Sequence, residues 1–213
     1  MAVITVQRGY GSGGDEVARL VADRLNLPLF DREITNTVAV RAGVSEETLR
    51  EATKTPSLLT RMAELLARYP MDDLLSWSMA GMPPAPPPSH EQYRRLIDEF
   101  VREVAANDDC VILGHGAQVV LKDHPRVLRV FLIANHSYRI QKVMLDEGLD
   151  RKAAEKQVLQ YDRDWRVFFQ TQYGIDWVDT RHYDLIMNLS RIGQDAATDM
   201  IVRAAQAIDQ LSR

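Results

Sequence analysis

The chain has 213 residues, of which 46% are hydrophobic and 26% charged, the composition of an ordinary globular protein with a sizeable core. Its 26 basic residues are outnumbered by 30 acidic ones, and a net charge of -4 argues against a nucleic-acid-binding surface. The sequence has no signal-peptide pattern, no apolar run of about 18 residues that would cross a membrane, and a lone Cys110 in an apolar run, so we expect a cytoplasmic protein.

The first thirty residues predict a strand, a helix and a second strand. Residues 2–6 form a β-branched run that stops at a glycine cluster, as a buried strand does. Apolar residues then recur at helical spacing over 17–25, and this helix should end near Asn26 because Pro28 follows. Residues 27–30 predict the second short strand.

The segment 34–79 predicts mostly helices. Its apolar stripe between Leu58 and Leu66 suits ordinary helix packing, and it would also suit a homodimer interface. The proline-rich segment 81–88 predicts an exposed, extended loop.

Strands and helices alternate through the rest of the chain. The pattern predicts strands at 111–113, 127–134 and 184–189, and helices at 89–107, 137–147, 151–172 and 195–211, the first capped by Ser89. Apolar strands that alternate with amphipathic helices predict an α/β protein with a parallel sheet covered on both faces.

A glycine-rich loop joins the first strand to the first helix. Four glycines in six residues allow a tight turn that brings backbone N–H groups close to an anion, and the helix adds its positive dipole end. The loop therefore predicts phosphate binding, while a strand-to-helix turn with no ligand is the alternative. The candidate residues are Arg8, Gly9, Gly11, Ser12, Gly13, Gly14 and Asp15.

The loop departs from the P-loop motif G-x-x-x-x-G-K-[ST] after its second glycine. Asp15 and Glu16 stand where the lysine and the hydroxyl residue belong, and two acids repel a polyphosphate. Three explanations remain open: Arg8 and arginines elsewhere supply the positive charge, ATP binds weakly, or Mg²⁺ screens the acids.

The segment 4–14, ITVQRGYGSGG, resembles the opening of the bacterial cytidylate kinase-like family, whose loop reads roughly ITISREYGSGG. The segments LFDREI, VILGHGA, VLRVFL, YDLIMN and SRIG are similar to further motifs of that family, in the same order. The resemblance implies a three-layer P-loop NTPase fold with a central parallel sheet. It further implies a single domain over 1–213, with a helical acceptor-binding insert at 35–90 and an arginine-bearing lid at about 139–180.

The resemblance implies magnesium-dependent transfer of a phosphoryl group from ATP to a nucleoside monophosphate such as CMP. Family members commonly carry arginine or lysine in place of Asp15 and arginine in place of His115, so this chain lacks two positive charges where phosphates should lie. The alternative is a catalytically impaired regulatory module that keeps the kinase fold and binds a nucleotide or a protein partner.

The catalytic candidates are the arginines Arg139, Arg163 and Arg166. Arg163 and Arg166 share a helical face by their i,i+3 spacing, and guanidinium forks suit phosphate oxygens. Because acidic residues flank them, a salt-bridged surface helix is the alternative.

The acceptor-binding candidates are Asp31, Arg32 and His115. Asp31 would orient the acceptor or a magnesium-bound water, with a helix cap as the alternative, and Arg32 would contact the acceptor phosphate or form an exposed ion pair. His115 lies between two glycines at the end of a strand, where neutral imidazole can donate a hydrogen bond. Arg191 is the candidate adenine contact, in the segment 190–193 that we expect to form a loop near adenine, and no set of metal ligands can be named from the sequence.

Overall fold

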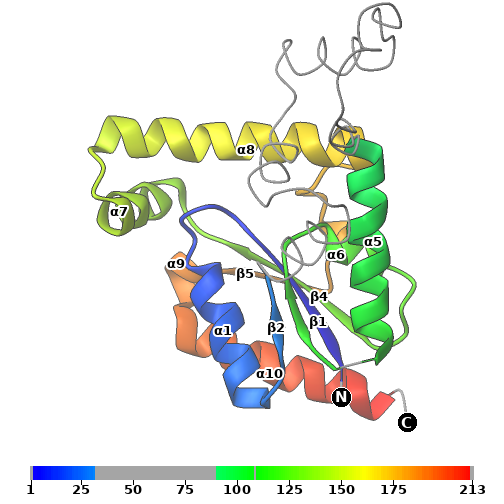
Figure 1. Ribbon diagram of the computed structural model, residues 1–213. Coiled ribbons are helices and arrows are strands. Elements are labelled where there is room, and N and C mark those ends of the chain that lie inside the picture. The colour runs from blue at the N-terminus through cyan, green and yellow to red at the C-terminus, as the bar shows by residue number, and fades with distance from the viewer. Residues whose placement is uncertain (1, 32–89, 108, 212–213) are drawn as a thin grey trace, which may run out of the picture.

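The computed structural model describes residues 2–31, 90–107 and 109–211 (Figure 1). The helices expected at 34–79, the proline-rich loop at 81–88, the cap Ser89 and the candidate Arg32 lie outside the described residues.

The described strands form one five-stranded sheet in which every neighbouring pair is parallel. From edge to edge, its strands are β2 (Leu29–Phe30), β3 (Val111–Leu113), β1 (Val3–Arg8), β4 (Val127–Ile133) and β5 (Leu185–Asn188). Because the strands are parallel, the loops that follow them meet at one edge of the sheet.

Helices cover both faces of the sheet, which gives three layers. On one face, α1 (Gly14–Leu25) and α10 (Gln194–Leu211) pack on a core that includes Ile4 and Val6 of β1. On the other face, α5 (His90–Asn107) and the short α6 (Ala117–Val120) pack on a core that includes Val3 and the fully buried Cys110. The alternation of side chains along β1 produces this division.

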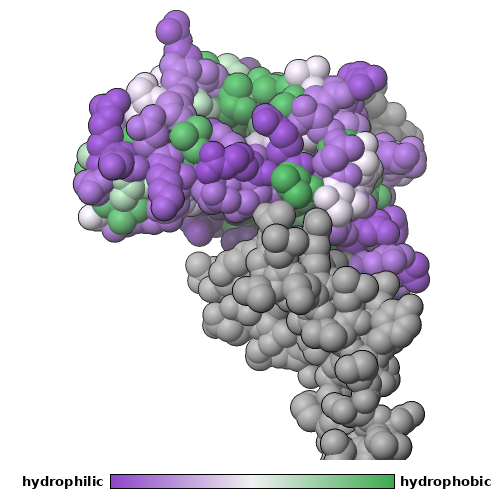
Figure 2. All heavy atoms as spheres, turned by 90° about the horizontal axis from the view of Figure 1, so that it is seen from above, coloured by the Kyte–Doolittle hydropathy of each residue, from purple (hydrophilic) through white to green (hydrophobic). Residues whose placement is uncertain are grey.

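Two further helices form a hairpin beyond the carboxyl edge of the sheet, α7 (His136–Glu147) and α8 (Arg151–Tyr173) (Figure 1). They pack together through Ile140, Val143, Ala154 and Val158. From above, the surface is mostly hydrophilic, with separate hydrophobic patches (Figure 2). The homodimer stays a prediction, because the apolar stripe that suggested it, between Leu58 and Leu66, lies outside the described residues.

The sequence located most of these elements to within two residues. It missed α6 and α9 (Leu189–Ile192), and the segment 190–193, which we expected to be a loop, instead includes this helical turn. A four-residue helix shows too little periodicity to be recognised. No described helix is both long enough and apolar enough to cross a membrane.

Candidate functional site

The glycine loop turns sharply between β1 and α1. Its turn is closed by hydrogen bonds from the Ser12 amide to the Gly9 carbonyl (3.0 Å) and from the Gly14 amide to the Ser12 hydroxyl (3.3 Å). Gly11 has a φ of +70°, and a Cβ there would lie 2.7 Å from the Arg139 carbonyl oxygen. The loop therefore requires glycine both for its backbone conformation and for its contact with α7.

Several amides at this turn are free to bind an anion. Among the residues that the structure describes, none accepts a hydrogen bond from the backbone N–H groups of Gly11, Gly13, Asp15 and Glu16. These four donors lie at the positive end of the α1 dipole, where an anionic group is stabilised.

Asp15 carries a charge that Arg8 balances. Arg8 Nη2 and Nε donate to Asp15 Oδ1 at 2.9 and 3.1 Å. Burial alone would lower the pKa of Arg8, but Tyr161 and Asp15 outweigh burial and raise it above its ordinary value. Arg8 Nη1 lies 2.8 Å from the position of a Cβ at Gly114, so this guanidinium reaches from the end of β1 to the end of β3.

Glu16 is balanced by a residue that the sequence did not single out. Lys142 Nζ of α7 lies 2.8 Å from Glu16 Oε1 and 3.1 Å from Asp146 Oδ2. The hydrogen bond to Glu16 is the main cause that raises the pKa of Lys142. Nothing local in the sequence links residues 16 and 142, so only the fold brings them together.

Arg139 binds the glycine loop to the α7–α8 hairpin. Its Nε donates to the Tyr10 carbonyl at 2.7 Å, and its Nη1 and Nη2 donate to the Asp162 carboxylate of α8 at 2.9 and 2.7 Å. Tyr10 also stacks on Tyr161, with ring centroids 5.0 Å apart, and its hydroxyl donates to Glu147 and accepts from Gln157. The sequence named Arg139 as a catalytic candidate, but it did not predict the contact of Arg139 with Tyr10 or with Asp162.

A hollow of about 370 Å³ opens beside the loop, between α8 and the last two strands. Its wall includes Gly9, Arg139 and Arg166, together with the nearly buried Phe131 and Trp177. The predicted pair on α8 is exposed, and Arg166 lines this hollow, whereas Arg163 donates to Gln160 Oε1 at 2.8 Å.

On the other side of Arg8, the ends of β2 and β3 bring His115 and Asp31 together. His115 Nε2 lies 3.0 Å from the Asp31 carbonyl oxygen, and the histidine has a φ of +56°. Burial lowers the pKa of His115 and outweighs the contact with Asp31, so the imidazole is neutral at ordinary pH. Tyr173 closes this side, because a Cβ at Gly116 would lie 2.7 Å from its hydroxyl oxygen.

Arg191 is exposed on α9, and its side chain has no hydrogen bond or ion pair with any residue that the structure describes. Its neighbourhood is fixed by Asn188, which donates to Asn135 Oδ1 at 3.0 Å and accepts from the Ser190 hydroxyl at 2.6 Å. The bond to Asn135 joins the end of β5 to the loop that follows β4.

Among the described residues, no group of three or more His, Cys, Asp or Glu side chains is placed to hold a metal ion. Mg²⁺ in phosphoryl-transfer sites needs only one or two carboxylates besides the phosphate oxygens. Asp15 and Asp31, which both help to raise the pKa of Arg8, are carboxylates that fit this requirement.

Comparison with known proteins relates the chain to nucleotide kinases. A cytidylate kinase from Thermococcus sibiricus is 34% identical over 124 residues, which is 57% of this chain and 61% of that protein. A cytidylate kinase from Ignicoccus hospitalis is 23% identical over 204 residues, with 95% and 98% of the two chains covered. The chain thus matches about three fifths of the length of the first of these relatives.

Solved structures share the fold. An uncharacterized protein from Eubacterium ventriosum matches with a TM-score of 0.67 at 22% identity over 97% of this chain and 99% of that one. A shikimate kinase from Bacteroides thetaiotaomicron matches with a TM-score of 0.50 at 15% identity, over the same shares of the two chains. The model of the cytidylate kinase-like family matches residues 3–191, so the chain belongs to that family and has its three-layer α/β P-loop fold.

Proposed function

We propose that the protein transfers a phosphoryl group from ATP to a nucleoside monophosphate, with CMP as the acceptor that the family suggests. The observation that carries the proposal is the set of free amides at the amino end of α1, in a chain of the cytidylate kinase-like family. Backbone donors held in place before the ligand arrives bind a polyphosphate without reorganisation of the protein.

The polyphosphate of ATP and the acceptor nucleotide would bind on opposite sides of Arg8. The glycine loop would hold the polyphosphate on one side of this guanidinium, and Asp31 and His115 would hold the acceptor on the other. Arg8 could then donate to the group in transfer, because a guanidinium presents several N–H donors in a planar fork. Mg²⁺, held by Asp15 or Asp31 together with phosphate oxygens, would neutralise part of the phosphate charge.

The hairpin would supply the remaining cations. Arg139 lies at the loop and Arg166 in the wall of the adjacent hollow, which supports a lid role for α7 and α8. Arg163 is exposed and uses one guanidinium nitrogen for its bond to Gln160, so its other N–H groups would be available to a ligand. We place the nucleobase in the hollow, whose wall includes Phe131 and Trp177.

A second function is favoured by the same charges. Arg8 and Lys142 are each paired with an acid of the loop, so the loop has little net positive charge for a transferring phosphate. A protein that binds a nucleotide without turning it over, as a regulatory module does, would tolerate this arrangement.

A turnover assay separates the two. The protein at high concentration is mixed with ATP, Mg²⁺ and each of CMP, UMP, AMP and GMP, and ADP is quantified by chromatography while calorimetry measures ATP binding. We expect ADP to form with at least one acceptor, CMP first. Binding of ATP without ADP from any acceptor would reject the kinase and favour the regulatory module, and absence of both would reject both.

A further inference from the structure

Each of the two acids that open α1 is paired with a cation from outside the helix. Asp15 is paired with Arg8, which comes from β1, whereas Glu16 is paired with Lys142, which comes from α7. These two acids occupy the positions of the lysine and the hydroxyl residue in G-x-x-x-x-G-K-[ST], so the loop segment after Gly9 carries no cation of its own.

Lys142 lies directly against the loop. Its Cε is 3.7 Å from the position of a Cβ at Gly13, the residue that caps α1. Gln194 Nε2, from the start of α10, is 2.8 Å from the same position. The ammonium therefore lies next to the amino end of α1, where the free amides of Gly13 and Glu16 are found.

Lys142 shares a helical face with Arg139. The two are three residues apart on α7, a spacing that places side chains on the same side of a helix. Arg139 contacts the loop at Tyr10, and Lys142 contacts the first turn of α1 at Glu16. One helix thus presents one cation to the loop and another to the start of α1.

The ammonium retains capacity for a ligand. A lysine has three N–H donors, and two of them are directed to Glu16 and Asp146. Its side chain is 21% exposed, so a ligand at the loop can reach it. The two carboxylates hold the ammonium in place and keep it protonated, as the raised pKa of Lys142 indicates.

We propose that Lys142 supplies the cation that the loop lacks, by donating a hydrogen bond to an oxygen of the bound polyphosphate. The proposal rests on the proposed function, because it names a contact of the same phosphate site. Its rival is a purely structural role, in which Lys142 only neutralises Glu16 and joins α7 to α1.

The first test is a pair of matched lysine variants. Calorimetry with inorganic tripolyphosphate should show about tenfold or greater weakening for Lys142→Gln, the loss expected when one charged hydrogen bond is removed. Lys142→Arg should recover most of the affinity. Lys156→Gln, which removes an exposed lysine from α8, should bind as the wild type does. Equal affinities for the wild type and Lys142→Gln would overturn the proposal.

A second test excludes the structural rival and the effects of misfolding. Glu16→Gln removes the acid that Lys142 neutralises, and we expect it to bind tripolyphosphate more tightly than the wild type. When Lys142→Gln is added to Glu16→Gln, a phosphate contact predicts the same tenfold loss, whereas a purely structural pair predicts no loss and would overturn the proposal. The comparison is made between variants whose thermal midpoints show them to be folded at the temperature of measurement.

The two proposals fail in different ways. If wild-type protein binds neither tripolyphosphate nor ATP, the phosphate site itself is rejected and both proposals fall. If the wild type binds both ligands and every Lys142 variant binds equally well, the phosphate site stands and only the role of Lys142 is rejected.

Discussion

The Asp15 carboxylate forms an ion pair with the Arg8 guanidinium. Substituting Asp15 therefore changes the charge at position 15 and also frees the charge of Arg8. Asp15→Lys replaces a negative charge with a positive one and also releases Arg8. We expect tripolyphosphate to bind at least about tenfold more tightly at low salt, with a smaller gain at high salt because ions screen partly exposed charges. Calorimetry at two ionic strengths measures both effects.

The matched control for Asp15→Lys is Asp199→Lys. Asp199 is an exposed acid of α10 that is paired with Arg24, so this variant reverses a charge at the same kind of ion pair away from the loop. Its affinity for tripolyphosphate should equal that of the wild type. If Asp15→Lys also leaves the affinity unchanged, the glycines form only a turn between β1 and α1.

His115 gives the fold a dependence on pH that can be measured without a ligand. Burial lowers its pKa below the value of the unfolded chain, about 6.5. Above this pH the His115 imidazole is neutral in both the folded and the unfolded state. Below it, His115 of the unfolded chain binds a proton, whereas His115 of the folded protein stays neutral. Stability should therefore fall by up to about 1.4 kcal/mol per pH unit between pH 6.5 and the lower folded pKa.

His115→Asn removes this contribution, and asparagine tolerates the φ of +56° better than most residues. Urea unfolding at pH 7.5 and 5.5 should show a smaller loss of stability for this variant than for the wild type. His136→Asn, at a position about half exposed, should keep the wild-type difference. A wild-type pH dependence in His115→Asn would show that the buried imidazole does not cause it.

The sequence predicted which residues lie together at the carboxyl edge of the sheet, but it did not predict which residues of different helices contact one another. His115 and Asp31 both follow strands, and parallel strands bring their ends together, so these two were expected at one site. Arg139 and Asp162 are 23 residues apart on different helices, and their contact depends on how α7 and α8 dock. No periodicity or motif reports that docking.

At the scale of elements, Arg139 and Tyr10 connect the α7–α8 hairpin to the glycine loop. Arg139 is only 11% exposed, so Asp162→Asn leaves a nearly buried cation with a neutral partner. We expect a loss of about 1–3 kcal/mol in the free energy of unfolding, because an unpaired charge is costly away from water. Urea unfolding measures this loss, and hydrogen exchange should show faster opening of α7 and α8.

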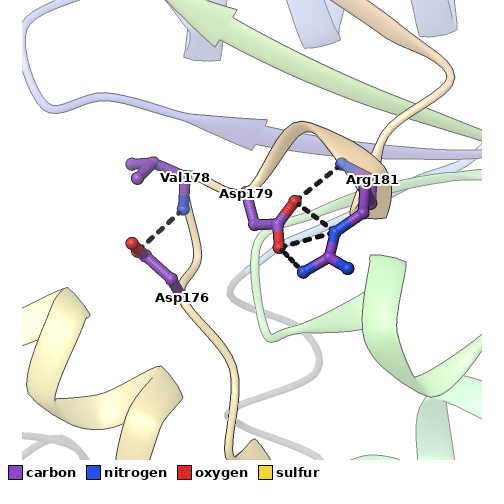
Figure 3. Close-up of polar contacts among 4 residues, drawn as sticks. All are labelled: Asp176, Val178, Asp179 and Arg181. Atoms are coloured by element: carbon purple, nitrogen blue, oxygen red, sulfur yellow. Dashed lines mark hydrogen bonds and ion pairs between the residues drawn. The ribbon is translucent and has the colours of Figure 1, made fainter.

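Asp179→Asn is the control, because it removes an acid from an exposed ion pair. Asp179 accepts from the Arg181 guanidinium and from its amide, while Arg181 is 86% exposed (Figure 3). Hydrogen bonds from Arg181 lower the pKa of Asp179 to about 2, so the pair is intact at neutral pH. Exposed pairs contribute little to stability because solvent screens them, so we expect a smaller loss than for Asp162→Asn. Equal behaviour of the two variants would show that Asp162 does not hold the hairpin.

At the scale of the whole molecule, the parallel sheet gathers the glycine loop, Asp31 and His115 at one edge. The strand order β2-β3-β1-β4-β5 places β1 and its glycine loop between the loop that carries His115 and the loop that carries Asn135. Alternating patterns in the sequence predicted a parallel sheet but not this order, which is fixed by which strands pair. The position of α8 across the edge, where Arg166 and not Arg163 lines the hollow, also had no local signal.

If the edge binds polyphosphate, the ligand should stabilise the folded chain. A ligand at about 100 times its dissociation constant contributes about 2.7 kcal/mol, which for a chain of this size raises the thermal midpoint by roughly 5–10 °C.

Gly11→Ala should abolish this rise, because its Cβ would lie 2.7 Å from the Arg139 carbonyl and must distort the loop. Gly148→Ala has a similar positive φ of +66° but open space around it, so it should lower the midpoint and yet keep the full rise with tripolyphosphate. The comparison separates backbone strain, which both variants share, from loss of the anion site. A full rise in folded Gly11→Ala would place the polyphosphate elsewhere on the molecule.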